Sequence, residues 1–271
     1  MIRHTVFENY ELDSPLATIN PAVKMICSVI VMLFVSVVFD LQTLSLLTAF
    51  GALMVLGLGR VRPLVLARAL LPFLLFGVGF LWMNALLPRS AGTTLFTVGP
   101  VAISAEGLRN GVSFFLRALT FGVWSVLFVA STEPTRFVLS LVHQLSVPPK
   151  IAYSALAAYR YLPSLQIELE QIRGAHRLRG VGEAGGLRGK IQRVYRYTVP
   201  LLAGALRRAG RVAAAMEARG FSGMNRTWYR KESLRLRDAA YAIGVLSVTS
   251  LIIWWGLYSE TLMLWSGRLW E

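Results

Sequence analysis

Residues 23–58 read VKMICSVIVMLFVSVVFDLQTLSLLTAFGALMVLGL and hold two charged residues, Lys24 and Asp40. A helix that crosses a bilayer needs about 20 mostly apolar residues. This stretch supplies two such runs, Val23 to Phe39 and Leu41 to Leu58, and little more than Asp40 separates them. Because lipid cannot solvate exposed backbone groups, the two runs must form a tight helical hairpin.

Three further apolar runs follow, at Ala69 to Leu87, Gly111 to Ala130 and Ala239 to Leu257. The chain of 271 residues is 55% hydrophobic, above the roughly 45–50% that is usual in a soluble domain. The sequence therefore predicts an all-α polytopic membrane protein with about five transmembrane helices. The first run lacks a small-residue cleavage pattern, so we expect a retained anchor and no cleaved signal peptide.

The net charge of +14 is concentrated in one window. Residues 131–238 hold 19 of the 28 basic residues and 7 of the 14 acidic ones, which makes the window +12 and the rest of the chain +2. Lys and Arg in short links mark the cytoplasmic side of a membrane. The link at Asp40 has none, the next has Arg60, Arg62 and Arg68, and the third has Arg89 and Arg109.

This alternation predicts that the N-terminus and the basic window are cytoplasmic and that the C-terminus is outside. We divide the chain into four parts: a cytoplasmic N-terminal segment (1–22), four transmembrane helices with an outer loop at 88–110 (23–130), a basic cytoplasmic region (131–238), and the last transmembrane helix with the outer C-terminus (239–271). Within the outer loop, Thr93 to Ile103 alternates in polarity, which predicts an extended segment at the outer surface.

Helical patterns fill most of the basic window. Ile151 to Ile172 is helical in pattern, with a kink expected at Pro163. Val181 to Lys190 is rich in glycine and predicts a loop. Val199 to Gly220 is a second amphipathic pattern, with apolar residues on one side and arginines on the other.

A six-residue pattern, A-x-x-x-R-G, closes both helical segments. Ala175, Arg179 and Gly180 form the first copy, and Ala215, Arg219 and Gly220 form the second, forty positions later. An ordinary helix end explains one copy, because Arg suits the last turn and Gly the C′ position. Two copies favour a functional role, in which each Arg is held at a helix end and takes a carboxylate or backbone carbonyls of a partner bidentately. Two such ends would fit two equivalent grooves, as on a dimer.

The second copy lies in Ala214-Ala215-Met216-Glu217-Ala218-Arg219-Gly220-Phe221, which resembles the transmembrane (T) components of energy-coupling factor (ECF) transporters, the EcfT/CbiQ-like family of ABC importers. Weaker marks accompany it in the same order along the chain: Ser14-Pro15-Leu16, Asn20-Pro21 and Lys24, Ser131-Thr132-Glu133-Pro134, Val147-Pro148-Pro149 and Leu162-Pro163. The chain departs from the family pattern at Leu178, where Ala is common, and at Ala17, where a His is frequent.

The resemblance implies a non-catalytic coupling subunit in the plasma (inner) membrane of a prokaryote. Two cytoplasmic coupling helices, ending at Arg179 and Arg219, would dock into grooves of two ATPase subunits. The coupling residues it implies are Ala175, Arg179, Gly180, Ala215, Glu217, Ala218, Arg219 and Gly220. ATP-driven motion would then reach a small membrane-embedded substrate-binding (S) subunit that takes up a vitamin or a transition-metal ion such as cobalt or nickel.

Other candidate sites are weaker. Residues 184–191 resemble a P-loop but have Ala184 where Gly is required and Ile191 where Ser or Thr must meet magnesium, so ATP would be bound by a partner and we expect no cofactor in this chain. His4, His143 and His176 show no metal-ligand spacing, and no catalytic motif is present. Arg117 lies inside an apolar run, where it either snorkels outward or contacts the helix bundle or the S subunit.

Two other functions compete with a T component. A conventional ABC permease would usually show one coupling motif per chain. A membrane-anchored nucleic-acid binder would need aromatic residues among the basic ones, and only Phe221 adjoins an Arg-Gly motif. We therefore expect no nucleic acid among the partners.

Overall fold

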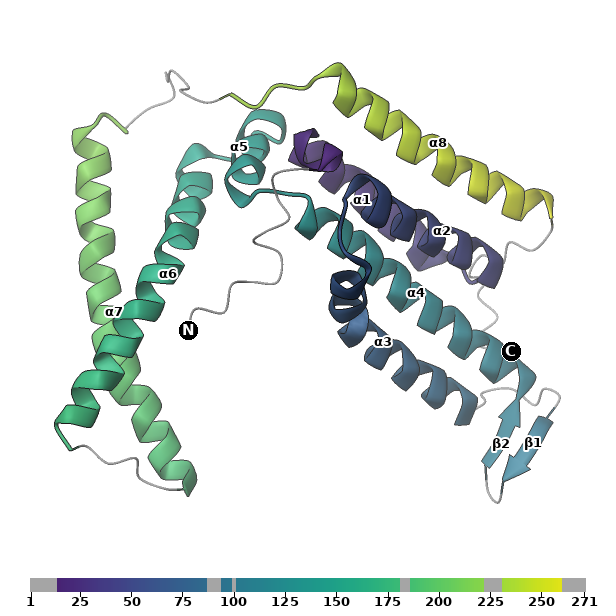
Figure 1. Ribbon diagram of the computed structural model, residues 1–271, viewed down its shortest axis with the longest axis horizontal. Coiled ribbons are helices and arrows are strands. Elements are labelled where there is room, and N and C mark those ends of the chain that lie inside the picture. The colour runs from purple at the N-terminus through teal and green to yellow at the C-terminus, as the bar shows by residue number, and fades with distance from the viewer. Residues whose placement is uncertain (1–13, 87–93, 99–100, 181–185, 222–230, 260–271) are drawn as a thin grey trace. The chain divides into compact units, whose positions relative to one another are not determined.

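The computed structural model describes residues 14–86, 94–98, 101–180, 186–221 and 231–259. The chain divides into two compact units, residues 1–146 with 232–271 (unit 1) and residues 147–231 (unit 2). Residues 131–146 and 232–238 of the basic window thus belong to unit 1. The elements of both units are labelled in Figure 1.

Unit 1 is a bundle of apolar helices. It comprises a short 3₁₀ turn (Pro15–Thr18), α1 (Pro21–Val37), α2 (Leu41–Leu53) continued by a π-helical turn (Met54–Leu58), α3 (Pro63–Leu86), α4 (Ala105–Ala130), α5 (Pro134–Gln144) and α8 (Leu236–Tyr258). Among the residues that the structure describes, four helical segments are long and apolar enough to cross a membrane: Leu41–Leu58, Pro63–Asn84, Gly107–Ala130 and Leu236–Tyr258. The apolar α1 has 17 residues, at the lower end of the spanning range. The predicted all-α membrane class is confirmed.

The first two apolar runs form two helices joined by a short turn, and Asp40 lies at the start of the second; each of the two helices packs on α4 and α8. Helix α1 ends at Val37 and α2 begins at Leu41. The Asp40 carboxylate accepts hydrogen bonds from the backbone N–H and the hydroxyl of Thr43, both at 2.8 Å. It therefore caps the first turn of α2, where backbone N–H groups lack helical partners.

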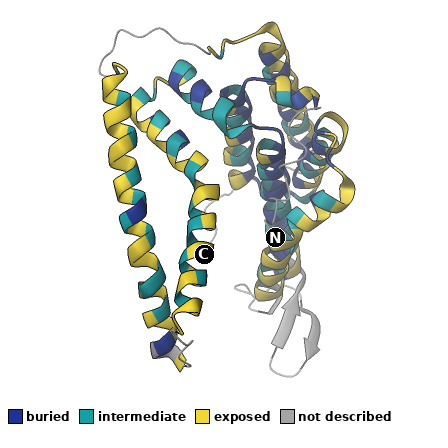
Figure 2. Cartoon of the chain, turned by 60° about the vertical axis from the view of Figure 1, so that its left-hand side comes forward, coloured by how far each residue is buried: buried dark blue, intermediate teal, exposed yellow. Residues whose placement is uncertain are grey.

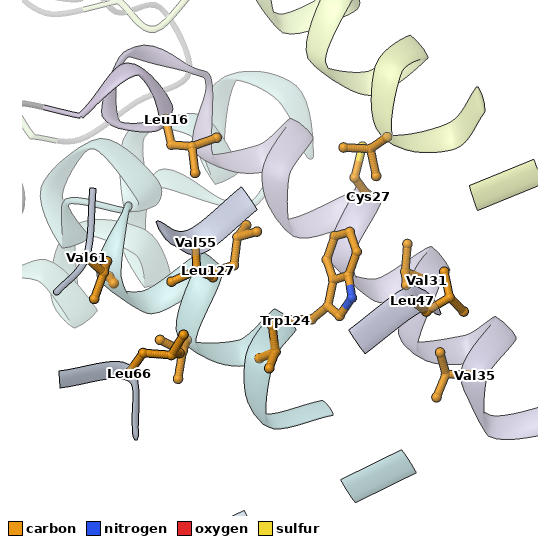
Figure 3. Close-up of a cluster of buried hydrophobic side chains, with 14 of the residues drawn as sticks. Leu16, Cys27, Val31, Val35, Leu47, Val55, Val61, Leu66, Trp124 and Leu127 are labelled. Atoms are coloured by element: carbon orange, nitrogen blue, oxygen red, sulfur yellow. The ribbon is translucent and has the colours of Figure 1, made fainter. Parts of the chain in front are cut away.

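The core of unit 1 forms around Trp124 of α4, which is fully buried (Figure 3). Val31 and Val35 of α1 and Leu47 of α2 belong to the same cluster. Helices α2 and α4 approach closely at Gly51, where a Cβ atom would lie 2.9 Å from a methyl carbon of Val123. Burial of these side chains fixes the packing of α1, α2 and α4.

A two-stranded antiparallel hairpin lies between α3 and α4. Strand β1 (Thr94–Val98) pairs with β2 (Val101–Ser104), with Val98 opposite Val101. This confirms the extended structure predicted for Thr93 to Ile103 within the described residues. Among those residues the hairpin is the exception to a helical fold.

Unit 2 consists of two long helices, α6 (Pro149–Leu178) and α7 (Gly186–Ala218). The predicted first helix therefore extends in both directions, and Pro163 lies inside it. The prediction of a loop over Val181 to Lys190 is wrong from Gly186 onward, and residues 181–185 lie outside the described part of the chain. The sequence predicts the second amphipathic helix at Val199 to Gly220, but the helix begins earlier, at Gly186, and continues through Pro200.

Candidate coupling site

The first A-x-x-x-R-G copy forms the C-terminal end of α6. The backbone N–H of Arg179 donates to the carbonyl of Ala175 at 3.2 Å, and that of Gly180 donates to Arg177 at 3.1 Å. Gly180 has a φ of +66°, a conformation that L side chains rarely adopt and that glycine tolerates. Arg179 is therefore the last residue held by the helix before the chain turns away.

The second copy ends α7 in the same way. Gly220 has a φ of +76°, and its N–H donates to the carbonyl of Glu217 at 2.9 Å. The N–H of Phe221 donates to the carbonyl of Met216 at 3.0 Å. These two bonds are the pair that defines a Schellman cap, which needs a residue such as glycine at the C′ position.

Both arginines are exposed, as are Ala175, Ala215, Glu217 and Ala218. Ala175 and Arg179 are four residues apart, as are Ala215 and Arg219, so each pair shares a helix face. Because alanine has a short side chain, little protrudes from this helix face one turn before the arginine. The local geometry thus combines a helix cap with an outward-facing guanidinium, and the cap alone does not require arginine.

Contacts between α6 and α7 hold the two helix ends far apart (Figure 1). The rings of Tyr153 and Phe221 pack edge to face at 5.8 Å between centroids, and those of His176 and Tyr197 lie 5.6 Å apart. The N-terminal part of α6 therefore contacts the C-terminal end of α7, and the two helices run in opposite directions. A helix rises roughly 40 Å between Tyr153 and Arg179. Phe221, which packs on Tyr153, follows Arg219 closely in the sequence, so Arg219 lies near the opposite end of α6 from Arg179.

Much of both helices is exposed, as the two yellow and teal helices at the left of Figure 2 show. One apolar stripe runs along α7. Its members, at helical spacing and each at least 62% exposed, are Ile191, Tyr195, Leu202 and Leu206. An exposed stripe of this kind marks a surface that a partner or a membrane covers.

Arg117 lies on α4 and is held inside unit 1. Its Nη2 donates to the carbonyl of Val38 at 2.6 Å and its Nε to that of Val35 at 3.2 Å. The guanidinium also lies over the Phe39 ring, 4.2 Å from the centroid. These carbonyls end α1 and lack helical partners, so Arg117 caps α1 from a neighbouring helix.

A second group of polar residues, which sequence reasoning did not assemble, joins three helix ends of unit 1. Lys24 of α1 is 1% exposed, and its ammonium donates to the Ser131 carbonyl at 2.5 Å and to the Leu16 carbonyl at 3.1 Å. The Asp238 carboxylate at the start of α8 accepts from the Asn20 N–H at 2.7 Å. The start of α1, the end of α4 and the start of α8 therefore lie together.

The same end of unit 1 holds both chain segments that lead to unit 2. Arg136 of α5 donates to Glu232 through Nε at 2.9 Å and Nη2 at 3.1 Å, and it also donates to the carbonyl of Ala17. The hydrogen bond to Glu232 raises the pKa of the Arg136 guanidinium above its usual value. The side-chain amide of Gln144 donates to the Glu232 carbonyl at 2.8 Å. We call Arg136, Gln144 and Glu232 the exit clamp, because it ties the outgoing chain to the returning one.

Within the described residues, no three His, Cys, Asp or Glu side chains come together as a metal site would require. The arrangement offers binding surfaces: two arginine-tipped helix ends, an apolar stripe and a clamped connection to an apolar bundle. It defines a membrane-embedded protein with a separate helical unit suited to docking.

The comparisons with known proteins identify the family. A family model described as "CbiQ: Cobalt transport protein" matches residues 13–229. The chain is 30% identical over 262 residues to the energy-coupling factor transporter transmembrane protein EcfT of Heliobacterium modesticaldum, covering 93% of this chain and 97% of that one. It is also 30% identical over 251 residues to EcfT of Limosilactobacillus fermentum, covering 89% and 92%.

A third relative is named as an ABC transporter ATP-binding protein, from Bifidobacterium longum. It is 28% identical over 257 residues, which cover 92% of this chain and 33% of that protein. The chain belongs to the EcfT/CbiQ family, as the motifs predict, and is a transmembrane component of an energy-coupling factor transporter.

Proposed function

We propose that this chain couples a cytoplasmic ATPase dimer to a membrane-embedded S subunit, with Arg179 and Arg219 as the docking residues. One observation carries the proposal: the two A-x-x-x-R-G copies form equivalent capped helix ends with exposed arginines. Because these ends lie roughly 40 Å apart along the helix pair, they fit two separate grooves better than one. Two equivalent grooves are what an ATPase dimer presents.

Each motif residue has a stated task in this proposal. The arginine supplies a planar fork for a carboxylate or carbonyls of the ATPase. The glycine lets the helix stop directly after the arginine. Ala175 and Ala215 keep the approach open, and Glu217 and Ala218 complete the second contact surface. No cofactor binds to this chain, because the ATPase subunits hold the nucleotide.

The relative from Bifidobacterium longum supports an ATP-binding partner. That protein is named for ATP binding, and the region like this chain is one third of its length. Residues 184–191 of this chain lack the Gly and the Ser or Thr that a P-loop requires. We infer that ATP hydrolysis takes place on separate subunits.

The membrane side of the chain would pass the motion of unit 2 to the S subunit. The exit clamp would carry motion of unit 2 into the helices of unit 1, and the stripe of Ile191, Tyr195, Leu202 and Leu206 offers an apolar surface for a small S subunit. The cargo would be a vitamin or a transition-metal ion, and the family description favours cobalt for some members. The basic helix pair would lie on the cytoplasmic side of the plasma membrane.

Co-purification tests this function against a conventional permease. The tagged chain, expressed with its neighbouring genes and isolated in mild detergent, should bring down two ATPase subunits and a small membrane protein that binds substrate alone. Arg219→Ala should lower the yield of the ATPase, and Arg211→Ala, an exposed arginine outside the motif, should not. A complex that transports without any S subunit would contradict the proposal.

A further inference from the structure

Helices α6 and α7 cross (Figure 1) at an ion pair that lies over a glycine. Arg208 of α7 donates through Nη2 to the Glu168 carboxylate of α6 at 2.6 Å. Gly204, one turn before Arg208, is buried, whereas its neighbours on α7 are exposed or half-buried. A Cβ atom at Gly204 would overlap the other carboxylate oxygen of Glu168, Oε1. The carboxylate therefore lies directly against the α7 backbone, in a gap that a glycine leaves.

This contact fixes the register of the two helices as well as their closeness. The Arg208 guanidinium lies 5.7 Å from the centroid of the Tyr161 ring, so Arg208 meets α6 at two points along its length. Along α7, Pro200 and Arg208 flank Gly204 at spacings of four residues, which place the three on one helix face. If α7 slid along α6 by one turn, about 5.4 Å, the carboxylate would meet the side chain of Pro200 or Arg208 in place of the gap.

The contact lies at the same helical distance from both arginine-tipped ends. Glu168 is eleven residues before Arg179, and Arg208 is eleven residues before Arg219, so each arm has about three helical turns. The proline inside each helix precedes the contact, so neither arm is interrupted by one. Because the helices run in opposite directions, the arms extend to opposite sides of the crossing. A slide of one helix along the other would therefore change the separation of the two ends.

We propose that Gly204, Glu168 and Arg208 are positioning residues that set the separation of the two arginine-tipped ends. The inference rests on the proposed function, in which Arg179 and Arg219 dock into two grooves of one ATPase dimer. Two linked docking sites bind about 10²–10⁴ times more tightly than one, and this gain is lost when the spacing does not let both engage. A displaced crossing would therefore weaken ATPase binding without a change to either docking arginine.

The first measurement records the distance between the two arms in the full chain, in lipid nanodiscs without ATPase. Spin labels are attached to cysteines placed at Leu178 of α6 and Ala213 of α7, which are exposed, and the native Cys27 is buried. Double electron–electron resonance then gives the distance distribution. Gly204→Leu should move or broaden it by about 2–5 Å, because the spacing of packed helices varies by about 2 Å with the side chains at the contact and a slip of one turn is about 5.4 Å.

Two further variants support this measurement. Gly204→Ala displaces the carboxylate and favours helix formation, so it should give a smaller change and keeps the test valid if Gly204→Leu folds poorly. Gly210→Leu is the matched control on the same helix, because Gly210 has open space around it. The control should leave the distance distribution unchanged.

The second measurement is the affinity of each variant for the ATPase dimer. We expect Gly204→Leu to lower this affinity at least about tenfold, since one docking end no longer engages together with the other, and Gly210→Leu to leave it unchanged. In an Arg219→Ala background, Gly204→Leu should cause no further loss, because one end alone remains to dock. A residue that merely stabilised the fold would weaken binding equally in both backgrounds, and that result would overturn the positioning role.

The outcomes separate this inference from the proposed function. If the double variant Arg179→Ala/Arg219→Ala binds the ATPase normally, the docking role is wrong and the positioning role falls with it. If that variant loses binding while both Gly204 variants bind as the Gly210→Leu control does, the positioning role is wrong and docking stands. An unchanged distance distribution in both Gly204 variants would also overturn the positioning role.

Discussion

A double-mutant cycle on Arg136 and Glu232 tests whether the exit clamp holds unit 1 together where the chain leaves and returns. The two side chains are 21% and 13% exposed and share two hydrogen bonds, at 2.9 Å and 3.1 Å. Exposed ion pairs couple by about 0.2–1 kcal/mol, whereas hydrogen bonds to charged groups contribute about 1.5–3 kcal/mol. For a partly buried bidentate pair we expect a coupling energy of about 1–3 kcal/mol.

The assay compares free energies of unfolding in detergent for the wild type, Arg136→Met, Glu232→Gln and the double variant. Coupling is the part of the double effect that the single effects do not explain. The Arg208–Glu168 pair serves as the matched control. It is 25% and 24% exposed and has one hydrogen bond, so its coupling should be smaller. A coupling energy for Arg136 and Glu232 below about 0.3 kcal/mol, within the usual error of additivity, would refute the clamp.

Three further predictions concern unit 1 and the topology. A cysteine placed in the segment 181–190 should resist impermeant reagents in intact cells, and one near Gly267 should react; the reverse pattern would overturn the proposed orientation. Thr93 to Ile103 should crosslink to the membrane domain and not to an ATPase subunit, so ATPase crosslinks would contradict an outer location. Gly111→Ala should destabilise the protein by about 1–3 kcal/mol in thermal unfolding, because its Cβ would lie 2.9 Å from the Leu81 carbonyl oxygen. Gly79→Ala, with open space around it, should be neutral or stabilising, and equal losses at both sites would reject the close α3–α4 approach.

Local patterns were sufficient to predict the apolar helices and the motif positions. Hydrophobic run length indicates the apolar helices, of which four among the described residues are long enough to cross a membrane, and Asp40 between two runs indicates the turn that joins α1 to α2. The A-x-x-x-R-G copies predict helix ends because arginine and glycine act there through local backbone geometry. The start of α7 was misplaced because the glycines of residues 181–190 are typical of a loop, whereas the helix begins at Gly186.

The polar joins of unit 1 could not be predicted, because their partners are distant in sequence. Asn20 and Asp238 are 218 positions apart, and Lys24 meets the Ser131 carbonyl across 107 positions. Arg117 and Lys24 donate to backbone carbonyls, which every residue carries and no pattern marks. A lysine inside an apolar run was the available signal, since a buried charge requires partners. The residues quoted for the family resemblance at Asn20, Lys24 and Ser131 are among those that meet here.

We propose that Arg179 and Arg219 couple the chain to the ATPase and contribute little to its folding. An exposed arginine at a helix end contributes about 0.3–1 kcal/mol to the fold, whereas truncating one that pairs with a carboxylate at an interface costs about 2–5 kcal/mol of binding. Arg→Lys should restore coupling only in part, because an ammonium lacks the planar fork.

The most direct measurement compares the double variant Arg179→Ala/Arg219→Ala with the wild type in one membrane preparation. It records the abundance of the chain, the ATPase that co-purifies with it, and substrate uptake. We expect normal abundance of the chain, with ATPase association and substrate uptake lower than in either single variant. Normal uptake by the double variant would contradict the coupling role, and loss of the chain itself would show that the arginines serve the helix caps.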